Sequence, residues 1–312
     1  MVYLQLALGF LLLVAGGEAL VRGAVSVASR LGVSPLLIGL TLVGFGTSTP
    51  ELVTSLQAAF DGLPGIALGN VVGSNVANVL LILGVAAIIA PVAAARAGFR
   101  RDGTALAVAT ALCVGVVLYG ALDRWLGGVL VAALAIYLVV AYLTDRAGEP
   151  DPAAASDAAP LPGPLWLTLA LAVGGIAVTI LGARLAVDAA VSLALVWGMS
   201  ETVVGLTIVA VGTSLPELVT SVVAALRRES GIAFGNVVGS NIYNILGILG
   251  VTALVRPIAV PMQIAQLDVW VMTGAALALI AAVALRQRVD RVTGLAFLAA
   301  YTGYTAWLVS SA

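Results

Sequence analysis

Long apolar stretches separated by short polar breaks run through almost all of the chain. The apolar residues between the breaks form ten segments, each near the roughly 20 residues that a helix needs to cross a bilayer. The pattern therefore predicts an all-α polytopic membrane protein with ten transmembrane helices. The expected spans are 4–29, 35–60, 65–91, 102–121, 125–144, 164–196, 201–226, 231–255, 264–285 and 289–310.

Composition supports this prediction. Of the 312 residues, 62% are hydrophobic and only 9% are charged, too few to cover the surface of a soluble domain of this size. All fourteen basic residues are arginines and there is no histidine, which excludes catalysis by a histidine base or a Schiff-base lysine. We therefore expect no enzyme. The single Cys113 allows no disulfide within the chain, and the first apolar segment, which lacks a basic start, is expected to be an uncleaved span.

The arginines predict the orientation in the membrane. With ten spans, the loops after the odd-numbered spans lie on one side and hold ten arginines, whereas the opposite side holds only Arg124 and Arg256. Cytoplasmic loops carry an excess of basic residues. We therefore expect a multi-pass protein of the cytoplasmic membrane with both termini outside.

A repeat divides the chain into halves. Shifted by 166 residues, the segments 44–84 and 210–250 are identical at 26 of 41 positions. Five spans in each half is an odd number, so the second copy must enter the membrane from the opposite face, as in many secondary transporters. We expect a first inverted repeat at 1–143 with its motif at 43–84, a flexible cytoplasmic linker at 144–163, and a second repeat at 164–312 with its motif at 209–250.

Two charged pairs lie in the first span of each half. Glu18 and Arg22 are four residues apart, and their counterparts Arg184 and Asp188 have the opposite signs. Charges in a membrane helix are costly unless they are paired. We expect ion pairs within a helix or between the halves, with a structural role.

The stretch "VGFGTSTPELVTS" (43–55) places polar residues inside an apolar span, and "VAVGTSLPELVTS" (209–221) repeats it. On a helix, Thr47 and Ser48 lie one turn before Glu51 on the same face. Pro50 removes a backbone hydrogen bond, so the helix should break here and free carbonyl oxygens. Hydroxyl, carboxylate and carbonyl oxygens are the ligands that hard cations such as Ca²⁺ require.

Both carboxylates, Glu51 and Glu217, lie within strongly apolar spans. An unpaired carboxylate inside the membrane indicates a functional site, and the inverted repeat should bring the two together near the bilayer midplane. A shared proton or a structural bond from glutamate to asparagine is the alternative.

The following span supplies a second polar face. In "GNVVGSNVANVLLILG" an asparagine or serine recurs every four residues, and "GNVVGSNIYNILGILG" repeats the pattern. Cation ligation is favoured for Ser74, Asn78, Ser240 and Asn244. For Asn70, Asn75, Asn236 and Asn241, ligation and a polar contact between helices remain equally open. The glycines of this segment, Gly69, Gly73, Gly235 and Gly239, should allow close approach of helices.

The paired motifs "GTSTPE…GNVVGSN" and "GTSLPE…GNVVGSN" closely resemble those of the cation/Ca²⁺ antiporter superfamily, in particular prokaryotic sodium/calcium exchangers. The resemblance implies alternating access, in which Na⁺ flows inward while Ca²⁺ leaves and the first span of each half slides across the other eight. It implies no cofactor and no protein or nucleic-acid partner beyond the transported ions and the bilayer. The implied ligands are Thr47, Ser48, Glu51, Ser74, Asn78, Thr213, Ser214, Glu217 and Ser240, with the carbonyl groups of Gly44 and Ala210.

Asn244 departs from part of that family, because some archaeal and potassium-dependent relatives carry aspartate there. Two carboxylates then remain, Glu51 and Glu217. One Ca²⁺ balances them, whereas three Na⁺ would leave one positive charge. We therefore expect electrogenic exchange that needs no K⁺.

Three rival functions are considered. In a Ca²⁺/H⁺ exchanger, protons on Glu51 and Glu217 would replace Na⁺, although the hydroxyl pairs at 47–48 and 213–214 have no evident role with protons. A cation channel needs a continuous pore, whereas an inverted repeat suits alternation. An intramembrane hydrolase would need a base for the "GTS" nucleophile, and the chain has no histidine or lysine.

Overall fold

The computed structural model describes residues 2–94, 96–147, 161–197 and 210–311, and nearly all of them are helical. The helices before the interval at 148–160 are α1 (Val2–Leu31), α2 (Pro35–Ile38), η1 (Gly39–Val43), α3 (Gly44–Thr47), α4 (Thr49–Phe60), α5 (Pro64–Ala77), η2 (Asn78–Ile82), α6 (Leu83–Ile89), α7 (Arg96–Tyr119) and α8 (Arg124–Ala147). Those after it are α9 (Leu165–Val196), α11 (Ala210–Gly212), α12 (Leu215–Leu226), α13 (Ser230–Ile242), η5 (Tyr243–Leu249), α14 (Gly250–Val255), η6 (Ile264–Asp268), α15 (Val269–Arg286) and α16 (Arg291–Ser311), where η marks a π-helical segment.

Seven helices in the described part of the chain are long and apolar enough to cross a membrane, and an eighth candidate is the bent pair Pro35–Thr47 and Thr49–Phe60. These eight coincide with eight of the predicted spans. Of the predicted span 201–226, residues 201–209 lie outside the described residues. At 289–310, α16 is a helix of 21 residues that is not among the seven. The all-α polytopic membrane fold is thus confirmed, and the number ten stays a prediction.

Two short antiparallel ladders join loops that are distant in the sequence. β1 (Val92–Ala93) pairs with β4 (Arg288–Val289), with Val92 opposite Val289. β2 (Ala121–Leu122) pairs with β3 (Ile258–Ala259), with Leu122 opposite Ile258. Each ladder links a segment of the first half to one of the second, so the halves are connected at two places outside the helices.

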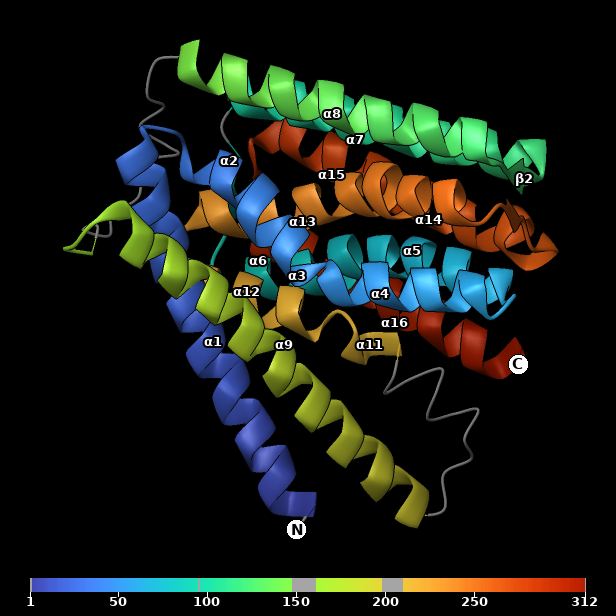
Figure 1. Cartoon of the computed structure of the whole chain (residues 1–312), viewed down its shortest axis with the longest axis horizontal. Coiled ribbons are helices and arrows are strands. Elements are labelled where there is room, and N and C mark those ends of the chain that lie inside the picture. The colour runs from blue at the N-terminus through green and yellow to red at the C-terminus, as the bar shows by residue number, and fades with distance from the viewer. Residues whose placement is uncertain (1, 95, 148–160, 198–209, 312) are drawn as a thin grey trace.

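The centre of the molecule consists of the two helical stretches 64–89 and 230–255. They are the most buried of the seven candidate spans, with 72% and 83% of their most apolar windows inside the protein. Figure 1 shows α7 and α8 along one edge of this centre and α1 and α9 crossing obliquely on the other side. The polar residues of both "GNVVGSN" motifs are therefore buried, except Asn70, which is partly buried.

α1 and α9 pack together so closely that no side chain separates their backbones. A Cβ atom added at Gly16 would lie 2.5 Å from the backbone nitrogen of Thr179, and one at Gly175 would lie 2.5 Å from that of Leu20. Small residues permit such contacts between membrane helices, where van der Waals packing replaces the hydrophobic effect. The two helices thus form one tightly packed unit, called the α1–α9 pair below.

The boundary of the predicted linker differs slightly in the structure. α8 continues to Ala147, so residues 144–147 at the expected start of the linker are helical. Leu161, close to its end, donates its N–H to Ser26 of α1 at 3.0 Å and accepts a hydrogen bond from Arg30 at 2.8 Å. The remainder, 148–160, lies outside the described residues.

The close packing of α1 on α9 predicts unequal effects at two neighbouring glycines. Gly175→Ala should lower stability by about 1–3 kcal/mol, because the new methyl group meets backbone atoms that cannot rotate away. Gly174→Ala is the matched control, since a methyl group added there would have nothing within 4 Å among the described residues. Thermal unfolding of the purified variants in detergent measures the difference, and equal melting temperatures would contradict the close approach.

Candidate functional site

Each half contains a helix break at a serine. Ser48 separates α3 from α4 with φ −82° and ψ 9°, and Ser214 precedes α12 with φ −91° and ψ 8°. Pro50 and Pro216 follow two residues later, and proline both lacks an N–H and obstructs the preceding turn. The predicted break at the first motif is confirmed, with a bend of 44° between the helical stretches Pro35–Thr47 and Thr49–Phe60.

The two breaks bring each serine to the carboxylate of the other half. Ser48 Oγ donates to Glu217 Oε1 at 2.9 Å, and Ser214 Oγ donates to Glu51 Oε1 at 3.4 Å. Both carboxylates are 1% exposed. The structure thus places Glu51 and Glu217 in one buried cluster, as the sequence predicts.

Asn70 and Asn236 hold the main chain beside the carboxylates. Asn70 Nδ2 donates to the carbonyl oxygen of Glu51 at 3.0 Å and to Ser55 Oγ at 2.9 Å. Asn236 Nδ2 makes the equivalent bonds in the second half, to Glu217 at 3.1 Å and to Ser221 at 2.8 Å. Both asparagine amide groups therefore serve as braces. Ser55 and Ser221 are absent from the predicted site, although their position four residues after each glutamate is a usable signal.

The deeper asparagines are oriented across the interface between the halves. Asn78 Nδ2 donates to Asn241 Oδ1 at 2.9 Å, and Asn244 Nδ2 donates to Asn75 Oδ1 at 3.2 Å. Because each amide uses its nitrogen in this bond, its oxygen points elsewhere. Asn75 and Asn241 thus position the amides of Asn244 and Asn78.

Four buried oxygens in this cluster have no hydrogen-bond partner among the described residues. They are Glu51 Oε2, Glu217 Oε2, Asn78 Oδ1 and Asn244 Oδ1. All four are acceptors, and equivalent atoms of the two halves appear in pairs. Burying such atoms without a donor is costly. Carboxylate and amide oxygens are the kind of ligand that hard cations take.

Thr47 and Ser240 lie beside this group. Thr47 Oγ1 is 3.0 Å from the carbonyl oxygen of Val43 and 3.2 Å from Asn236 Oδ1, and its proton can be given to either. Ser240 Oγ donates to the carbonyl oxygen of Gly44 at 3.2 Å. The hydroxyl of Ser240 thus already contacts a carbonyl group that the resemblance assigns to the site.

Close approach of α13 to the first half makes this contact possible. A Cβ atom at Gly235 would lie 2.6 Å from the carbonyl oxygen of Leu36, and one at Gly239 would clash with Leu40. The expectation of close approach is thus confirmed at these two glycines. At Gly69 and Gly73 it stays a prediction, because the positions equivalent to the neighbouring leucines lie within 198–209, outside the described residues.

Two π-helical segments begin at or beside the deep asparagines, η2 at Asn78 and η5 at Tyr243, one residue before Asn244. π-Helical turns are rare and often occur at functional sites. Neither the apolar pattern nor the motifs indicate them.

The other predicted ligands lie on the segments that carry the cluster. Ser74 is buried in α5, Thr213 directly precedes Ser214, and Ala210 is the first residue of α11. No group of three acidic, cysteine or histidine side chains that could hold a metal ion occurs in the described residues, so the cluster has two carboxylates.

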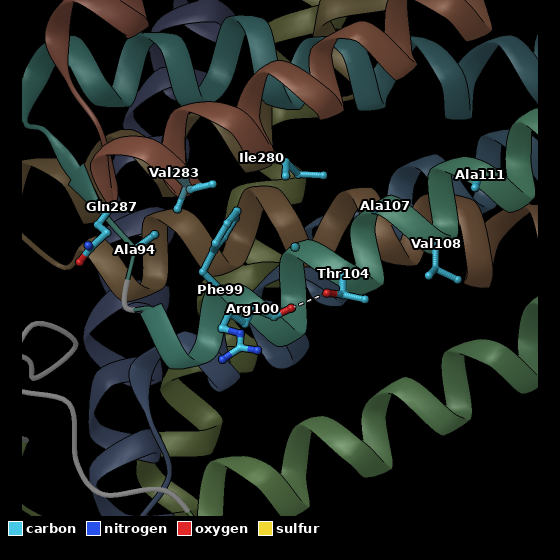
Figure 2. A pocket seen from close by; sticks show the side chains of 12 residues that line it. Ala94, Phe99, Arg100, Thr104, Ala107, Val108, Ala111, Ile280, Val283 and Gln287 are labelled. Carbon is cyan, nitrogen blue, oxygen red and sulfur yellow. Dashed lines mark hydrogen bonds between the residues drawn. The ribbon is translucent and has the colours of Figure 1, made fainter.

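A cavity of about 770 Å³ lies apart from this cluster, between α7 and α15 (Figure 2). Most of the side chains that line it are apolar, among them those of Ala107, Ala111 and Ile280. The exposed Arg100 and Gln287 lie at one end. None of the predicted ligands lines it, so the candidate site is the buried cluster.

A family model described as sodium/calcium exchanger protein matches residues 1–143 and 167–310. The chain belongs to this exchanger family. The resemblance to the cation/Ca²⁺ antiporter superfamily seen in the two motifs is thereby confirmed.

Relatives of this exchanger cover nearly all of the chain. The putative antiporter CaxA of Alkalimonas amylolytica is 37% identical over 310 residues and is covered, like this chain, to 97%. The sodium/calcium exchanger MaX1 of Methanosarcina acetivorans is 34% identical, again with 97% of both chains covered. A solved structure of the sodium-calcium exchanger NCX_Mj soaked with 2.5 mM Na⁺ and 1 mM Sr²⁺ is similar with a TM-score of 0.85 at 32% identity, covering 98% of this chain and 97% of that one.

The unpartnered oxygens predict that Ca²⁺ stabilises this exchanger through its two carboxylates. At a Ca²⁺ concentration about 100-fold above its Kd, wild type should gain about 2.7 kcal/mol. Glu51→Gln and Glu217→Gln should each lose most of this gain, because either variant removes half of the negative charge at nearly constant volume.

Melting temperature with and without Ca²⁺ measures this effect. The exposed Asp188→Asn on α9 serves as the matched control and should keep the full Ca²⁺ shift. A wild-type shift in either glutamine variant would place the cation elsewhere.

Proposed function

We propose that this protein is a secondary antiporter that exchanges Na⁺ for Ca²⁺ by alternating access. The observation that carries the proposal is the set of four buried, unpartnered acceptor oxygens on Glu51, Glu217, Asn78 and Asn244. They come equally from the two halves of the chain, as a site opened alternately to either face requires. The names of its relatives, a sodium/calcium exchanger and a putative antiporter, support the same activity.

The ligands of the transported ions are proposed to be those implied by the motifs. Glu51 and Glu217 supply the charge, and Ser74, Asn78, Ser240 and Asn244 supply neutral oxygens beside them. Additional ligands for Na⁺ would be the hydroxyl groups of Thr47, Ser48, Thr213 and Ser214 and the carbonyl groups of Gly44 and Ala210. No resident cofactor is needed, because the ions are the cargo.

Charge balance sets the proposed stoichiometry. One Ca²⁺ neutralises the two carboxylates, whereas three Na⁺ leave one net positive charge. Exchange of three Na⁺ for one Ca²⁺ therefore moves one charge per cycle, worth about 2.3 kcal/mol per 100 mV. Two Na⁺ would move none.

The halves are proposed to be inverted repeats of five spans each. The 166-residue repeat and the equivalent contacts of Asn70 and Asn236 with their own glutamates support this arrangement. The excess of arginine in the odd-numbered loops supports a cytoplasmic membrane orientation with both termini outside.

The α1–α9 pair is proposed to move as a unit across the remaining helices. Its two backbones are in direct contact, so sliding one helix against the other would disrupt packing along their full length. Sliding both together disturbs only contacts with the centre that run through side chains, such as that of Ile176 with Gly46. Such a motion would expose the buried cluster first to one face and then to the other.

The main alternative is a Ca²⁺/H⁺ exchanger in which Glu51 and Glu217 bind protons. The hydroxyl groups of Ser48 and Ser214 favour Na⁺, because they bring oxygen ligands to the same carboxylates and have no evident role in proton exchange. A channel is less well supported, since it needs a continuous pore, whereas both carboxylates are buried at 1% exposure.

Ca²⁺ uptake into proteoliposomes tests the proposal. Vesicles loaded with Na⁺ should accumulate ⁴⁵Ca²⁺, and an outward proton gradient without Na⁺ should not replace the Na⁺ gradient. A valinomycin-imposed potential, positive inside, should speed the uptake, because it counters the charge left by outward movement of three Na⁺. Uptake driven by protons would establish the rival exchanger, and a rate independent of potential would indicate two Na⁺ per Ca²⁺.

Asn244 provides a second test. Wild type should need no K⁺, because two carboxylates are already balanced by the transported ions. Asn244→Asp adds a third carboxylate at the position of an unpartnered oxygen. Three Na⁺ then balance the site, whereas one Ca²⁺ leaves one negative charge, so the Ca²⁺-bound variant should require an additional monovalent cation.

Uptake with and without K⁺, at pH 6 and pH 8, shows this requirement. Asn236→Asp is the contrasting variant, since the amide of Asn236 braces the main chain and its nitrogen is already used in two bonds. Identical profiles for wild type and Asn244→Asp would remove Asn244 from the site. K⁺ dependence of wild type would contradict K⁺-independent exchange.

A further inference from the structure

One ion pair joins the α1–α9 pair to the other helices in the described part of the chain. Arg227, directly after α12, contacts Glu18 of α1 through two of its nitrogens, with Nε 2.6 Å from Oε2. Arg22, one turn further along α1, also binds Glu18 at 2.6 Å. We call Glu18–Arg227 the inner pair, since Arg227 belongs to the side assigned to the cytoplasm.

The repeat supplies a second pair of opposite charges. Shifted by 166 residues, Glu18 corresponds to Arg184 and Arg227 corresponds to Asp61. Both signs are reversed, so Arg184–Asp61 would attract as Glu18–Arg227 does. We call it the outer pair, because Asp61 follows α4 on the opposite side.

In the structure the inner pair is formed, whereas Arg184 and Asp61 of the outer pair are not in contact as an ion pair. Asp61 accepts two hydrogen bonds of 3.1 Å from Gln57 of its own helix. Arg184 is exposed and makes no ion pair within the described residues. The expected intrahelical pair is also found only once in this part of the chain, because Glu18 binds Arg22 while Arg184 and Asp188 are not joined.

The reversal of sign has a physical reason. Loops on the cytoplasmic side favour arginine, so the residue after α12 is Arg227 whereas its counterpart on the outer side is Asp61. An attractive contact then requires an acidic partner on α1 and a basic one on α9. Glu18 and Arg184 meet that requirement. Ion pairs formed only within one helix would not require opposite signs at these two positions.

We propose that the inner and outer pairs form alternately and position the α1–α9 pair in its two states. In an inverted repeat, the contacts of one half in one state become those of the other half when access reverses. Movement that separates Glu18 from Arg227 at the inner side brings Arg184 toward Asp61 at the outer side. Each state then has one pair, so neither is favoured strongly. The inference rests on the alternating access proposed above.

The expected energy is modest. Side chains of the inner pair are 32% and 33% exposed, so solvent screens their attraction. Loss of such a pair should shift the equilibrium between states by about two- to fivefold. A shift of this size alters the rate of exchange without trapping the protein.

Cross-linking tests the alternation directly. In a Cys113→Ser background, Arg184→Cys with Asp61→Cys should react with a flexible bis-methanethiosulfonate as long as an arginine side chain. Glu18→Cys with Arg227→Cys should also react. Each cross-link should stop Ca²⁺ uptake, and reduction should restore it. Failure of the Arg184 and Asp61 cysteines to cross-link would overturn the inference.

Neutralising one inner residue tests the competition between the pairs. Arg227→Gln, added to the outer cysteine pair, should raise the cross-linking rate about two- to fivefold, because it removes the competing contact. Glu18→Gln should have the same effect, and combining the two should add nothing. Arg228→Gln is the matched control, since its exposed side chain lies next to Arg227 and takes no part in the pair.

The outcomes separate this inference from the proposed exchange. An unchanged cross-linking rate in Arg227→Gln would show that the inner pair does not set the equilibrium, even if uptake is normal. Alternating cross-links in a protein that carries no Ca²⁺ would overturn the proposed function and leave the two pairs in place.

Discussion

Two carboxylates buried at the meeting point of the halves are the constraint on which the rest of the structure depends. A serine hydroxyl satisfies one oxygen of each, and the second oxygen of each has no donor among the described residues. Leaving charged groups in this condition is far more costly than leaving a neutral group, so the proposed site needs a positive charge bound beside the two carboxylates. The broken helices follow from the same need, because they turn Ser48 and Ser214 toward the opposite carboxylate.

The amides extend this constraint into the centre of the molecule. Asn75 and Asn241 accept hydrogen bonds from the amide nitrogens of Asn244 and Asn78, respectively. These bonds fix the direction in which the amide oxygens of Asn244 and Asn78 point. An asparagine without such a partner could present either its nitrogen or its oxygen, and a nitrogen would repel a cation. In the proposed site, the two orienting asparagines would therefore contribute to selectivity for cations although they supply no ligand.

Much of this could be predicted from the sequence, for identifiable reasons. An acidic residue in an apolar span is conspicuous, which makes Glu51 and Glu217 easy to find, and proline indicates the helix break. Whether an asparagine binds an ion or orients a neighbour depends on how the two halves face each other. The hydrophobic period and the composition of the sequence carry no information about that arrangement. The number of spans stays a prediction, because residues 198–209 lie outside the described residues and α16 is not among the seven candidate spans.

The halves make equivalent contacts at the proposed site and different ones where the α1–α9 pair meets the centre. Ser48 and Ser214 each donate a hydrogen bond to the glutamate of the other half. An ion should therefore meet the same ligands whichever face it enters from. Glu18 and Arg184, in contrast, have opposite charges, and only the first is paired, among the described residues, with a residue beyond its own helix. Selectivity and access would then depend on separate residues, so the peripheral charges could change while the ligands stayed the same. An exchanger built this way can adjust how long it faces each side without altering which ions it holds.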